Sequence, residues 1–374
     1  MSSDLILLGI SLMTWGVGEA MFFIFQPLYL QQLGANPVAI GAIFGAAGIA
    51  MTIAHIPAGH LADRIGRKPL LLVSWIVATL ATWIMALAPS LSYFVVGMLI
   101  YNLTAFVSSP LSSYITAARG KLSVGRALTM ISALYNVGAI IGPWIGGQVG
   151  NQFGLRTIYL ISASLFVVSL GILLFIRAQP VEVRDPNELG NGKFLNQRFM
   201  TYLGVIFLAA FSMYLAQPLS SNYLQNQQNL SFDLIGTLGS VSGLGIVVLN
   251  LGLGNLNARY GYLLGQFAVA LFTLILWRGT SFAWFCVGYF LIGGYRFARS
   301  LATAQTRSLV HQSRMGIAYG MTETVSSSAT ILAPPVAGFL YDIKPQLMYI
   351  VGFIMILISI GISARFIPRT QKAV

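Results

Sequence analysis

Long apolar runs separated by short charged segments dominate this chain, and they leave few folds open to it. The stretch from Leu70 to Ala118 contains no charged residue at all. Over the whole chain, 56% of the residues are hydrophobic and 8% are charged, whereas a soluble protein carries roughly 25% charged residues. Because no soluble core could bury so much apolar surface, the sequence predicts an integral membrane protein.

The apolar runs have the length of membrane-spanning helices. A helix needs about 20 predominantly apolar residues to cross a bilayer. By this criterion the sequence predicts an all-α, polytopic fold with 12 transmembrane helices, at residues 5–30, 38–62, 69–88, 91–117, 125–150, 156–177, 199–223, 232–257, 262–277, 281–305, 315–340 and 346–367.

The positions of lysine and arginine predict how these helices are oriented. With the N-terminus inside, most cations fall in cytoplasmic loops, and the outer loops hold Arg156, Arg278 and Lys344. Cytoplasmic loops carry such an excess of cations, so we expect both termini inside and a multi-pass protein of the cytoplasmic (inner) membrane. The N-terminus lacks a basic region and a clear cleavage site, so we expect the first helix to be retained. The net charge of +12 then reflects topology and contact with anionic lipid rather than nucleic-acid binding.

The chain repeats itself on the two sides of a polar linker. Residues 178–198 combine proline, glycine and mixed charge, which is typical of a solvated linker. This linker separates an N-terminal half, 1–177, from a C-terminal half, 199–374. Gln-Pro-Leu at 26–28 recurs at 217–219, and Pro143 recurs as Pro334, both 191 residues later. Further matches, such as Gly41 with Gly236, are 195 residues apart. We therefore expect two pseudo-symmetric six-helix halves.

The loop between the second and third predicted helices carries the most specific motif. Residues 59–68 read G-x-L-A-D-R-x-G-R-K, which resembles the signature loop of the major facilitator superfamily. The resemblance implies a twelve-helix transporter working by alternating access, in which the loop aspartate latches the cytoplasmic side at the N-terminus of helix 11. A carboxylate is stabilised by the positive end of a helix dipole. The expected latch residues are Gly59, Asp63, Arg64, Gly66, Arg67 and Arg119, the last as a partner for Asp63 unless it is purely topogenic.

The fifth predicted helix contains a run of small residues around a proline. Its motif resembles G-x-x-x-G-P-x-x-G-G of the antiporter branch of the superfamily, which includes drug:proton antiporters, and comprises Gly138, Gly142, Pro143, Gly146 and Gly147. Small residues at this spacing let helices approach closely. The alternative interpretation is a packing contact beside helix 8 that carries no information about transport direction.

Two of the nine acidic residues lie well inside predicted membrane helices, Glu19 and Glu323. An ionisable group within the bilayer is costly and is a functional candidate by default. We therefore expect Glu19 to couple protons or bind a cation, the alternative being a structural hydrogen bond to a neighbouring helix.

Two arginines, Arg296 and Arg299, lie inside the tenth predicted helix. We expect one of them to pair with Glu323, since pairing lowers the cost of burying both charges. A static structural pair is the alternative, and Arg296 also suits an anionic substrate group. The remaining polar residues expected at the substrate cavity are Gln26, Tyr101, Asn102, Tyr214 and Gln217.

These features predict a secondary active transporter rather than an enzyme. We expect proton-coupled efflux of small hydrophobic or amphiphilic compounds, with a small-molecule substrate, protons and the lipid bilayer as partners and a monomeric chain. The fourth helix lacks the R-x-x-x-G pattern of many proton-coupled family members, so transport of a polar metabolite or organic anion stays open. A lipid flippase or scramblase, or a non-transporting receptor, is a further alternative. The sequence offers no nucleophile–base set, no phosphate-binding motif, no metal site and no cofactor motif.

Overall fold

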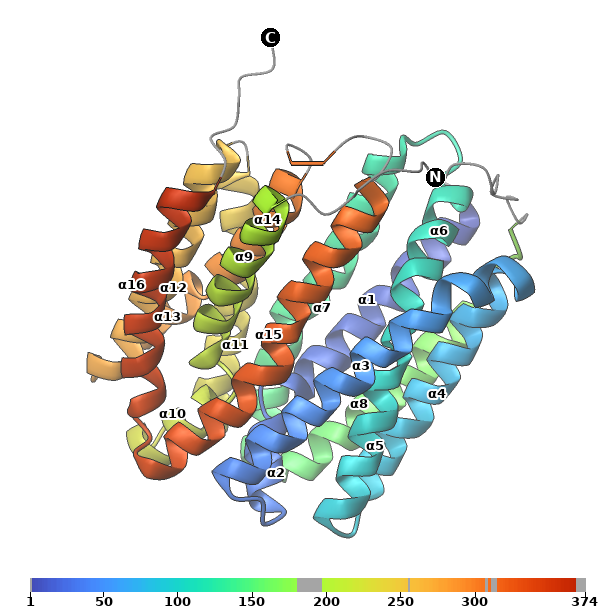
Figure 1. The fold of residues 1–374 in the computed structure, drawn as a ribbon. Helices are drawn as coiled ribbons and strands as arrows, with labels where there is room; N and C mark the ends of the chain where they lie inside the picture. The colour runs from blue at the N-terminus through green and yellow to red at the C-terminus, as the bar shows by residue number, and fades with distance from the viewer. Residues whose placement is uncertain (1, 180–196, 255, 307–308, 311–314, 368–374) are drawn as a thin grey trace. The chain divides into compact units, whose positions relative to one another are not determined.

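The computed structural model describes residues 2–179, 197–254, 256–306, 309–310 and 315–367. Within these residues the chain is helical and contains no strand. The helices are α1 Ser3–Phe23, α2 Gln26–Gln32, α3 Pro37–Ile65, α4 Arg67–Leu87, α5 Leu91–Leu103, the 3-10 helix η1 Thr104–Val107, α6 Ser108–Ala118, α7 Val124–Phe153, α8 Leu155–Leu174, α9 Gln197–Leu215, α10 Ser220–Gln228, α11 Phe232–Leu253, α12 Ala258–Arg278, α13 Phe282–Leu291, α14 Gly294–Thr306, α15 Met315–Ile343 and α16 Leu347–Phe366 (Figure 1).

Each predicted membrane helix coincides with one observed helix or with two or three consecutive helices. The first, fourth, seventh and tenth predicted helices are each interrupted, whereas the sequence predicted them to be continuous. Proline has no N–H and cannot continue a helix without disruption. Accordingly α2 starts with Pro27 in its first turn, and α10 begins directly after Pro218 and Leu219. The tenth is interrupted at Ile292 and Gly293.

By length and apolar composition alone, nine helices of the described part of the chain could cross a membrane, or ten if the bent pair Leu91–Val107 and Pro110–Ala118 forms one span. The two other expected spans are also helical, as α13 with α14 and as α15. They carry the ion pair between Arg299 on α14 and Glu323 on α15. Polar and charged residues lower the mean hydropathy of these two segments.

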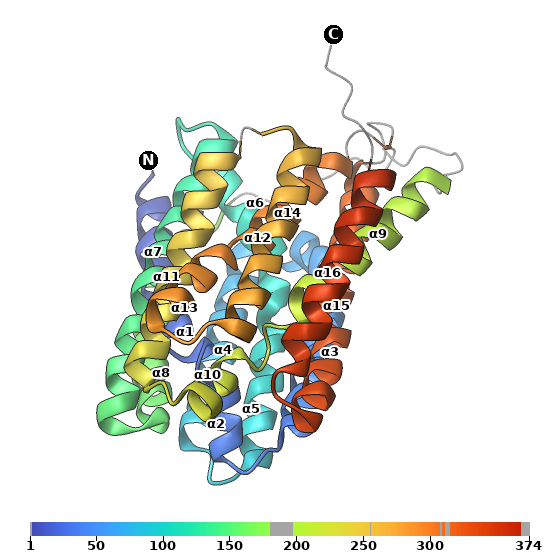
Figure 2. The same ribbon diagram turned by 90° about the vertical axis from the view of Figure 1, so that its left-hand side faces the viewer.

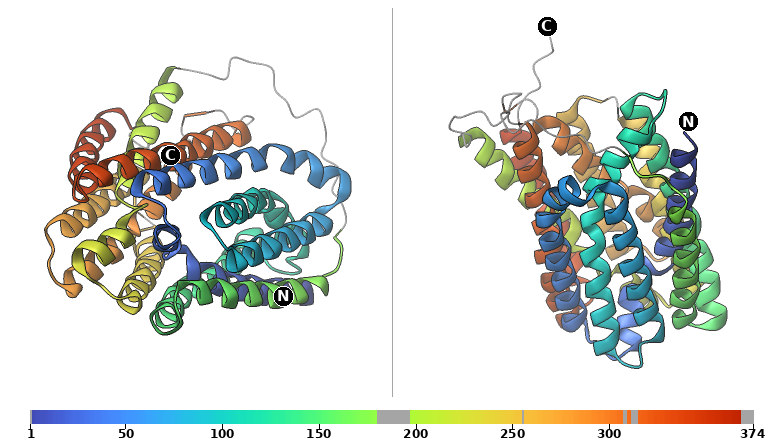
Figure 3. Two further views of the ribbon diagram at one scale, coloured as in Figure 1. Left: turned by 90° about the horizontal axis from the view of Figure 1, so that it is seen from below. Right: turned by 90° about the vertical axis from the view of Figure 1, so that its right-hand side faces the viewer.

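The chain divides into two compact units. Unit 1 comprises Met1–Ala35, Ala46–Arg184 and Asn229–Ser240, and unit 2 comprises Asn36–Gly45, Asp185–Gln228 and Val241–Val374. In unit 1, α1 packs along α7 and α8, and α4 packs along α5 and α8 (Figures 1 and 3). In unit 2, α12 packs along α14 and α16, and α9 packs along α15 and α16 (Figure 2).

The contacts of two short segments depart from the halves expected from the sequence. The start of α3, Asn36–Gly45, groups with unit 2, and the start of α11, Asn229–Ser240, groups with unit 1. Glycine explains both contacts. A Cβ on Gly41 would collide with the Pro334 carbonyl, and a Cβ on Gly236 would collide with the Pro143 carbonyl. The same glycine-on-proline contact thus occurs once in each unit. Residues 180–196 of the expected linker lie outside the described residues.

Candidate functional site

Glu19 lies on α1 in unit 1, and two tyrosines hold its carboxylate. The Tyr101 hydroxyl donates to Glu19 Oε1 at 2.7 Å, and the Tyr135 hydroxyl donates to Oε2 at 2.5 Å. Hydrogen bonds to an ionised acceptor are shorter and stronger than neutral ones. These three residues, here called the Glu19 cluster, bring together α1, α5 and α7.

Close contact between α1 and α7 allows Tyr135 to reach Glu19. A Cβ on Gly16 would lie 2.5 Å from the Tyr135 carbonyl oxygen, and a Cβ on Gly138 would collide with the backbone of Gly16 and Val17. Since only glycine fits at both positions, the helix backbones meet directly next to the carboxylate.

Aromatic rings surround the cluster on one side. Trp15 stacks on Phe166 with ring centroids 3.8 Å apart, and Tyr101 stacks on both rings at longer range. Trp15, Tyr101 and Phe166 are buried, whereas Glu19 is partly exposed. The carboxylate thus lies beside an apolar wall and keeps part of its surface exposed.

No cation compensates the Glu19 charge among the described residues. The ion pair found there is the one between Arg299 and Glu323 in unit 2. A carboxylate held by neutral donors can take up a proton or a cation without first breaking an ion pair. This is the chemistry expected of a coupling residue.

Arg299 and Glu323 form the second cluster, in unit 2. Arg299 Nη2 lies 2.6 Å from Glu323 Oε2, and Nε donates to the same oxygen at 3.1 Å. Thr303 donates to Glu323 Oε1 at 2.9 Å, and Arg299 Nη2 also donates to Ser327 at 3.2 Å. The side chains of Arg299 and Glu323 are 33% and 45% exposed. These four residues are called the Arg299 cluster.

Of the two arginines on α14, the structure pairs Arg299 with the acid and leaves Arg296 exposed. Arg296 forms no ion pair within the described residues. Both guanidinium groups interact electrostatically with Tyr214 and Tyr295, whose rings lie 5.7 Å apart. The sequence could not choose between the arginines, because both fall on the same predicted helix.

Two of the three amides expected at the cavity donate hydrogen bonds to the backbone carbonyl four residues earlier in the chain. The Asn102 side chain donates to the Met98 carbonyl and the Gln217 side chain to the Met213 carbonyl, both at 2.8 Å. Gln26 is buried in α2. Neither Asn102 nor Gln217 takes part in the Glu19 cluster or the Arg299 cluster.

The signature loop is described only in part. The side chains of Gly59, Asp63 and Arg64 lie outside the described residues. Gly66 has φ of +84° and joins α3 to α4, a backbone conformation that glycine adopts without strain. Arg119 donates to the Thr116 carbonyl at 2.5 Å. The latch therefore stays a prediction.

The small residues of the fifth predicted helix face α1 more than helix 8. Gly138, Gly142 and Gly146 all lie against the backbone of α1, between Gly16 and Met21. Gly147 and Pro143 are the positions that contact α11, the eighth predicted helix. The expected contact with the eighth predicted helix thus occurs on one face of α7, through Pro143 and Gly147. The glycines at four-residue spacing, Gly138, Gly142 and Gly146, lie on another face and pack against α1.

The sequence did not predict three side chains of the two clusters: Tyr135, Thr303 and Ser327. Hydroxyl residues are common in this chain, so residue type gave no signal. A signal for Tyr135 did exist, since glycines in the first and fifth predicted helices indicate close approach and Tyr135 precedes Gly138 by one helical turn.

Family comparison matches nearly the whole chain. The model described as Major Facilitator Superfamily matches residues 7–205 and 202–374. An MFS-type transporter of Methanocaldococcus jannaschii is 23% identical over 365 residues, covering 92% of each chain. Multidrug resistance protein 2 of Bacillus subtilis is 20% identical over 376 residues, covering 95% of this chain and 92% of the relative.

Multidrug resistance protein MdtG of Citrobacter koseri is 29% identical over 265 residues, which are 66% of this chain and 64% of that protein. Among solved structures, the nucleoside transporter NupG superposes with a TM-score of 0.79 at 15% identity, covering 97% of this chain and 98% of NupG. At this identity, the likeness to NupG concerns the fold.

Proposed function

Because the chain belongs to the major facilitator superfamily, and is therefore a multi-pass membrane transporter and not an enzyme, we propose that it exports small hydrophobic or amphiphilic compounds in exchange for protons. Glu19 is the residue that takes up and releases the proton. Substrate and proton then bind in alternation as the transporter exposes its binding site to each side of the membrane.

The Glu19 cluster carries this proposal. Its carboxylate is partly exposed, lies within a membrane helix and has neutral hydroxyl partners at both oxygens. Protonation removes the negative charge without leaving a cation unpaired. Binding of a cationic or amphiphilic compound beside the ionised form is favoured, so proton and substrate compete, and competition is the thermodynamic basis of exchange.

Two relatives support export of amphiphilic compounds. The proteins from C. koseri and B. subtilis are named multidrug resistance proteins. The aromatic rings of Trp15 and Tyr101 next to Glu19 offer apolar contact surface, which suits compounds that combine an aromatic body with a charge.

Direction and location complete the proposal. The distribution of cations favours both termini in the cytoplasm and insertion in the cytoplasmic membrane. The transporter is proposed to work as a monomer. In this orientation export uses the inward proton gradient.

Transport by purified protein in liposomes tests the function. Ethidium, an aromatic cation, is the probe, and its flux is measured with and without an imposed pH gradient. We expect the gradient to accelerate ethidium flux in the wild type and to have no effect in Glu19→Gln, while Glu19→Asp retains part of the response. A full gradient response in Glu19→Gln would reject the coupling role.

A polar metabolite or organic anion is the second candidate substrate. The exposed Arg296, which has no ion pair among the described residues, favours it. Organic anions that inhibit ethidium flux or are themselves transported would support this candidate.

A further inference from the structure

Two helix contacts of the fold correspond to each other through the internal repeat. In unit 1 the start of α11 packs on α7, with Gly236 against the Pro143 carbonyl. In unit 2 the start of α3 packs on α15, with Gly41 against the Pro334 carbonyl. The two glycines are 195 residues apart and the two prolines 191, which are the offsets of the repeat. The same contact is thus built twice.

The residue after each proline distinguishes the two contacts. In unit 1 this residue is Trp144, and its backbone N–H donates to the Ser240 hydroxyl oxygen at 3.1 Å. At the same offsets unit 2 has Pro335 and Gly45. Proline has no N–H and glycine has no hydroxyl, so unit 2 cannot form this hydrogen bond. The Pro335 ring lies there instead, with its Cγ 3.0 Å from the Cβ position of Gly45. Donor and acceptor therefore occur together in unit 1 and are missing together in unit 2.

The Ser240 hydroxyl is used for α7 and not for its own helix. Thr237, one turn earlier on α11, donates to the Asp233 carbonyl of the same helix at 2.9 Å, a common bond for such residues within a helix. Within the described residues, the bond from Trp144 is the hydrogen bond that Ser240 forms. Proline disturbs the backbone hydrogen bonds of the turn in which it lies. Ser240 thus supplies an acceptor to α7 directly after Pro143.

This hydrogen bond lies where α11 passes from one unit to the other. Residues Asn229–Ser240 belong to unit 1, and α11 continues into unit 2 from Val241. The corresponding helix α3 passes from unit 2 into unit 1 after Gly45. Alternating access, which the family implies, moves one half of a transporter against the other, and such movement strains both helices at these crossing points.

We propose that Ser240 is a latch that holds the start of α11 on α7 at its crossing point, whereas the contact of α3 with α15 relies on packing alone. The proposal goes beyond the proposed function, because it concerns how the two units are joined and not what is transported.

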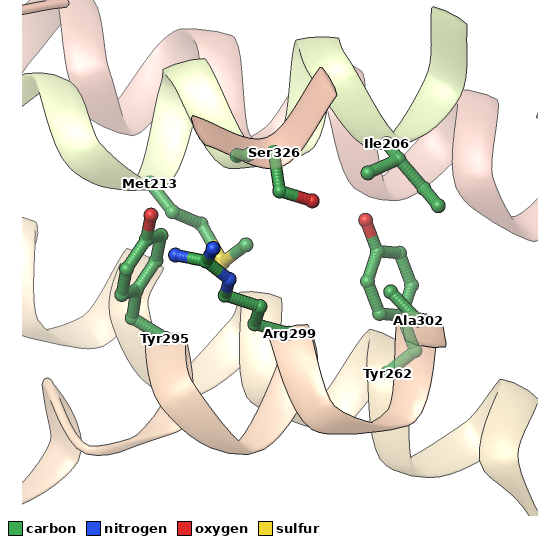
Figure 4. Close-up of a pocket in the computed structure, with 8 residues that line it drawn as sticks. Ile206, Met213, Tyr262, Tyr295, Arg299, Ala302 and Ser326 are labelled. Atoms are coloured by element: carbon green, nitrogen blue, oxygen red, sulfur yellow. The ribbon is translucent and has the colours of Figure 1, made fainter. Parts of the chain in front are cut away.

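Neither cluster of the candidate site takes part in the two contacts. The hydroxyls that hold Glu19 come from tyrosines of α5 and α7. Figure 4 shows Arg299 beside Tyr295, surrounded by residues of α9, α12, α14 and α15. A substitution at Ser240 leaves these groups in place, so its effect reports on the contact between α11 and α7.

Amide hydrogen–deuterium exchange of the purified full-length protein in detergent, read out by mass spectrometry, tests the latch. Ser240→Ala removes the acceptor and keeps a good helix former, so the start of α11 should leave α7 more often. Amide hydrogens around Trp144 and in the first two turns of α11 should then exchange about fivefold faster, the size of one typical hydrogen bond. Exchange at the contact of α3 with α15 should stay as in the wild type.

Two further variants make the result decisive. Thr237→Ala removes a hydroxyl of α11 that bonds within its own helix, and it should leave exchange around Trp144 unchanged. Ser240→Gly combined with Trp144→Pro reproduces the residue pair of unit 2. Because donor and acceptor are removed together, the start of α11 should exchange more slowly in this double variant than in Ser240→Gly alone.

Three outcomes would overturn the proposal. The first is unchanged exchange in Ser240→Ala, and the second is an equal acceleration in Thr237→Ala. The third is a double variant that exchanges as fast as Ser240→Gly.

The outcome is separable from the proposed function. Exchange is measured without ethidium and without a pH gradient. If Ser240→Ala has no effect on exchange while ethidium flux responds to the gradient, the latch is rejected and proton-coupled export stands. If Ser240→Ala accelerates exchange at α7 and α11 and the gradient has no effect on flux, the reverse holds.

Discussion

Glu19 gains its chemical character from two tyrosines that neighbour it in space and not in sequence. Each carboxylate oxygen accepts a hydrogen bond from one phenol hydroxyl. The two tyrosines hold the carboxylate in one orientation, so they are positioning residues for the proposed coupling acid.

Replacing Tyr135 by phenylalanine should weaken gradient-driven ethidium transport. The variant loses one hydrogen bond to the Glu19 carboxylate, and a hydrogen bond to a charged group contributes about 1.5–3 kcal/mol. Tyr101 alone then holds the carboxylate, so the response of ethidium flux to an imposed pH gradient should fall. Tyr159→Phe, which removes a buried hydroxyl that has no hydrogen-bond partner, is the control. An unchanged gradient response in Tyr135→Phe would show that the hydrogen bond has no part in coupling.

The Arg299–Glu323 pair makes a prediction about stability. Removing one partner leaves a partly buried charge without compensation, whereas removing both does not. Arg299→Gln should therefore lower the melting temperature more than Arg299→Gln with Glu323→Gln. Thermal unfolding of the purified variants measures both. A double variant that is less stable than Arg299→Gln alone would contradict the cost of the uncompensated carboxylate.

Single residues mark the limit of what the sequence predicted. Glu19, Tyr101, Arg299 and Glu323 stand out because they are polar residues in apolar helices. Whether Arg299 or Arg296 pairs with Glu323 depends on the rotation of α14. The hydrogen bond from Tyr135 to Glu19 depends on the contact between α1 and α7. Neither follows from residue type, since both are set by packing between distant segments.

At the scale of helices, glycine decides how closely α1 and α7 approach. A Cβ on Gly138 would collide with the backbone of Gly16 and Val17, which cannot move aside as a side chain can. The helices would have to separate, and Tyr135 would move away from Glu19 with its helix.

Gly138→Ala should therefore destabilise the protein by ~1–3 kcal/mol and reduce gradient-driven ethidium flux. Gly171→Ala in α8 is the matched control, because nothing lies within 4 Å of its Cβ position. Alanine should be neutral or stabilising there by ~0.5–1 kcal/mol. Unfolding of both variants in detergent measures the difference, and equal stability would contradict the direct backbone contact.

Helices were the most predictable level of the structure. Apolar length placed every expected span on a helix. The breaks in the first and seventh spans follow from Pro27 and Pro218, which the sequence analysis used as evidence for the repeat and not as helix breakers. The sequence predicted that the glycines of α7 form a helix contact, but it did not predict α1 as the partner. The spacing of small residues identifies a contact surface without identifying the helix that packs on it.

For the whole molecule, the distribution of cations predicts both termini in the cytoplasm. Fusions of green fluorescent protein and of alkaline phosphatase to the C-terminus test this directly. The first should fluoresce and the second should be inactive, since each reporter works on one side of the membrane. An active phosphatase would show that the C-terminus lies outside, which would reverse the direction of the proposed exchange.

The two units share one pattern of helices and differ in the charge they carry. Among the described residues, Glu19 on α1 of unit 1 forms no ion pair, whereas α14 and α15 of unit 2 carry Arg296, Arg299 and Glu323. Family membership accounts for the shared pattern. In the proposed exchange, this difference in charge assigns the proton to unit 1.

Proton release on substrate binding tests this assignment most directly. Ethidium is added to purified protein in weakly buffered solution, and the pH change is recorded across the neutral range. The wild type should release protons in proportion to the ethidium bound, and Glu19→Gln should bind ethidium without releasing them. Equal proton release from the wild type and Glu19→Gln would contradict the assignment of the proton to Glu19.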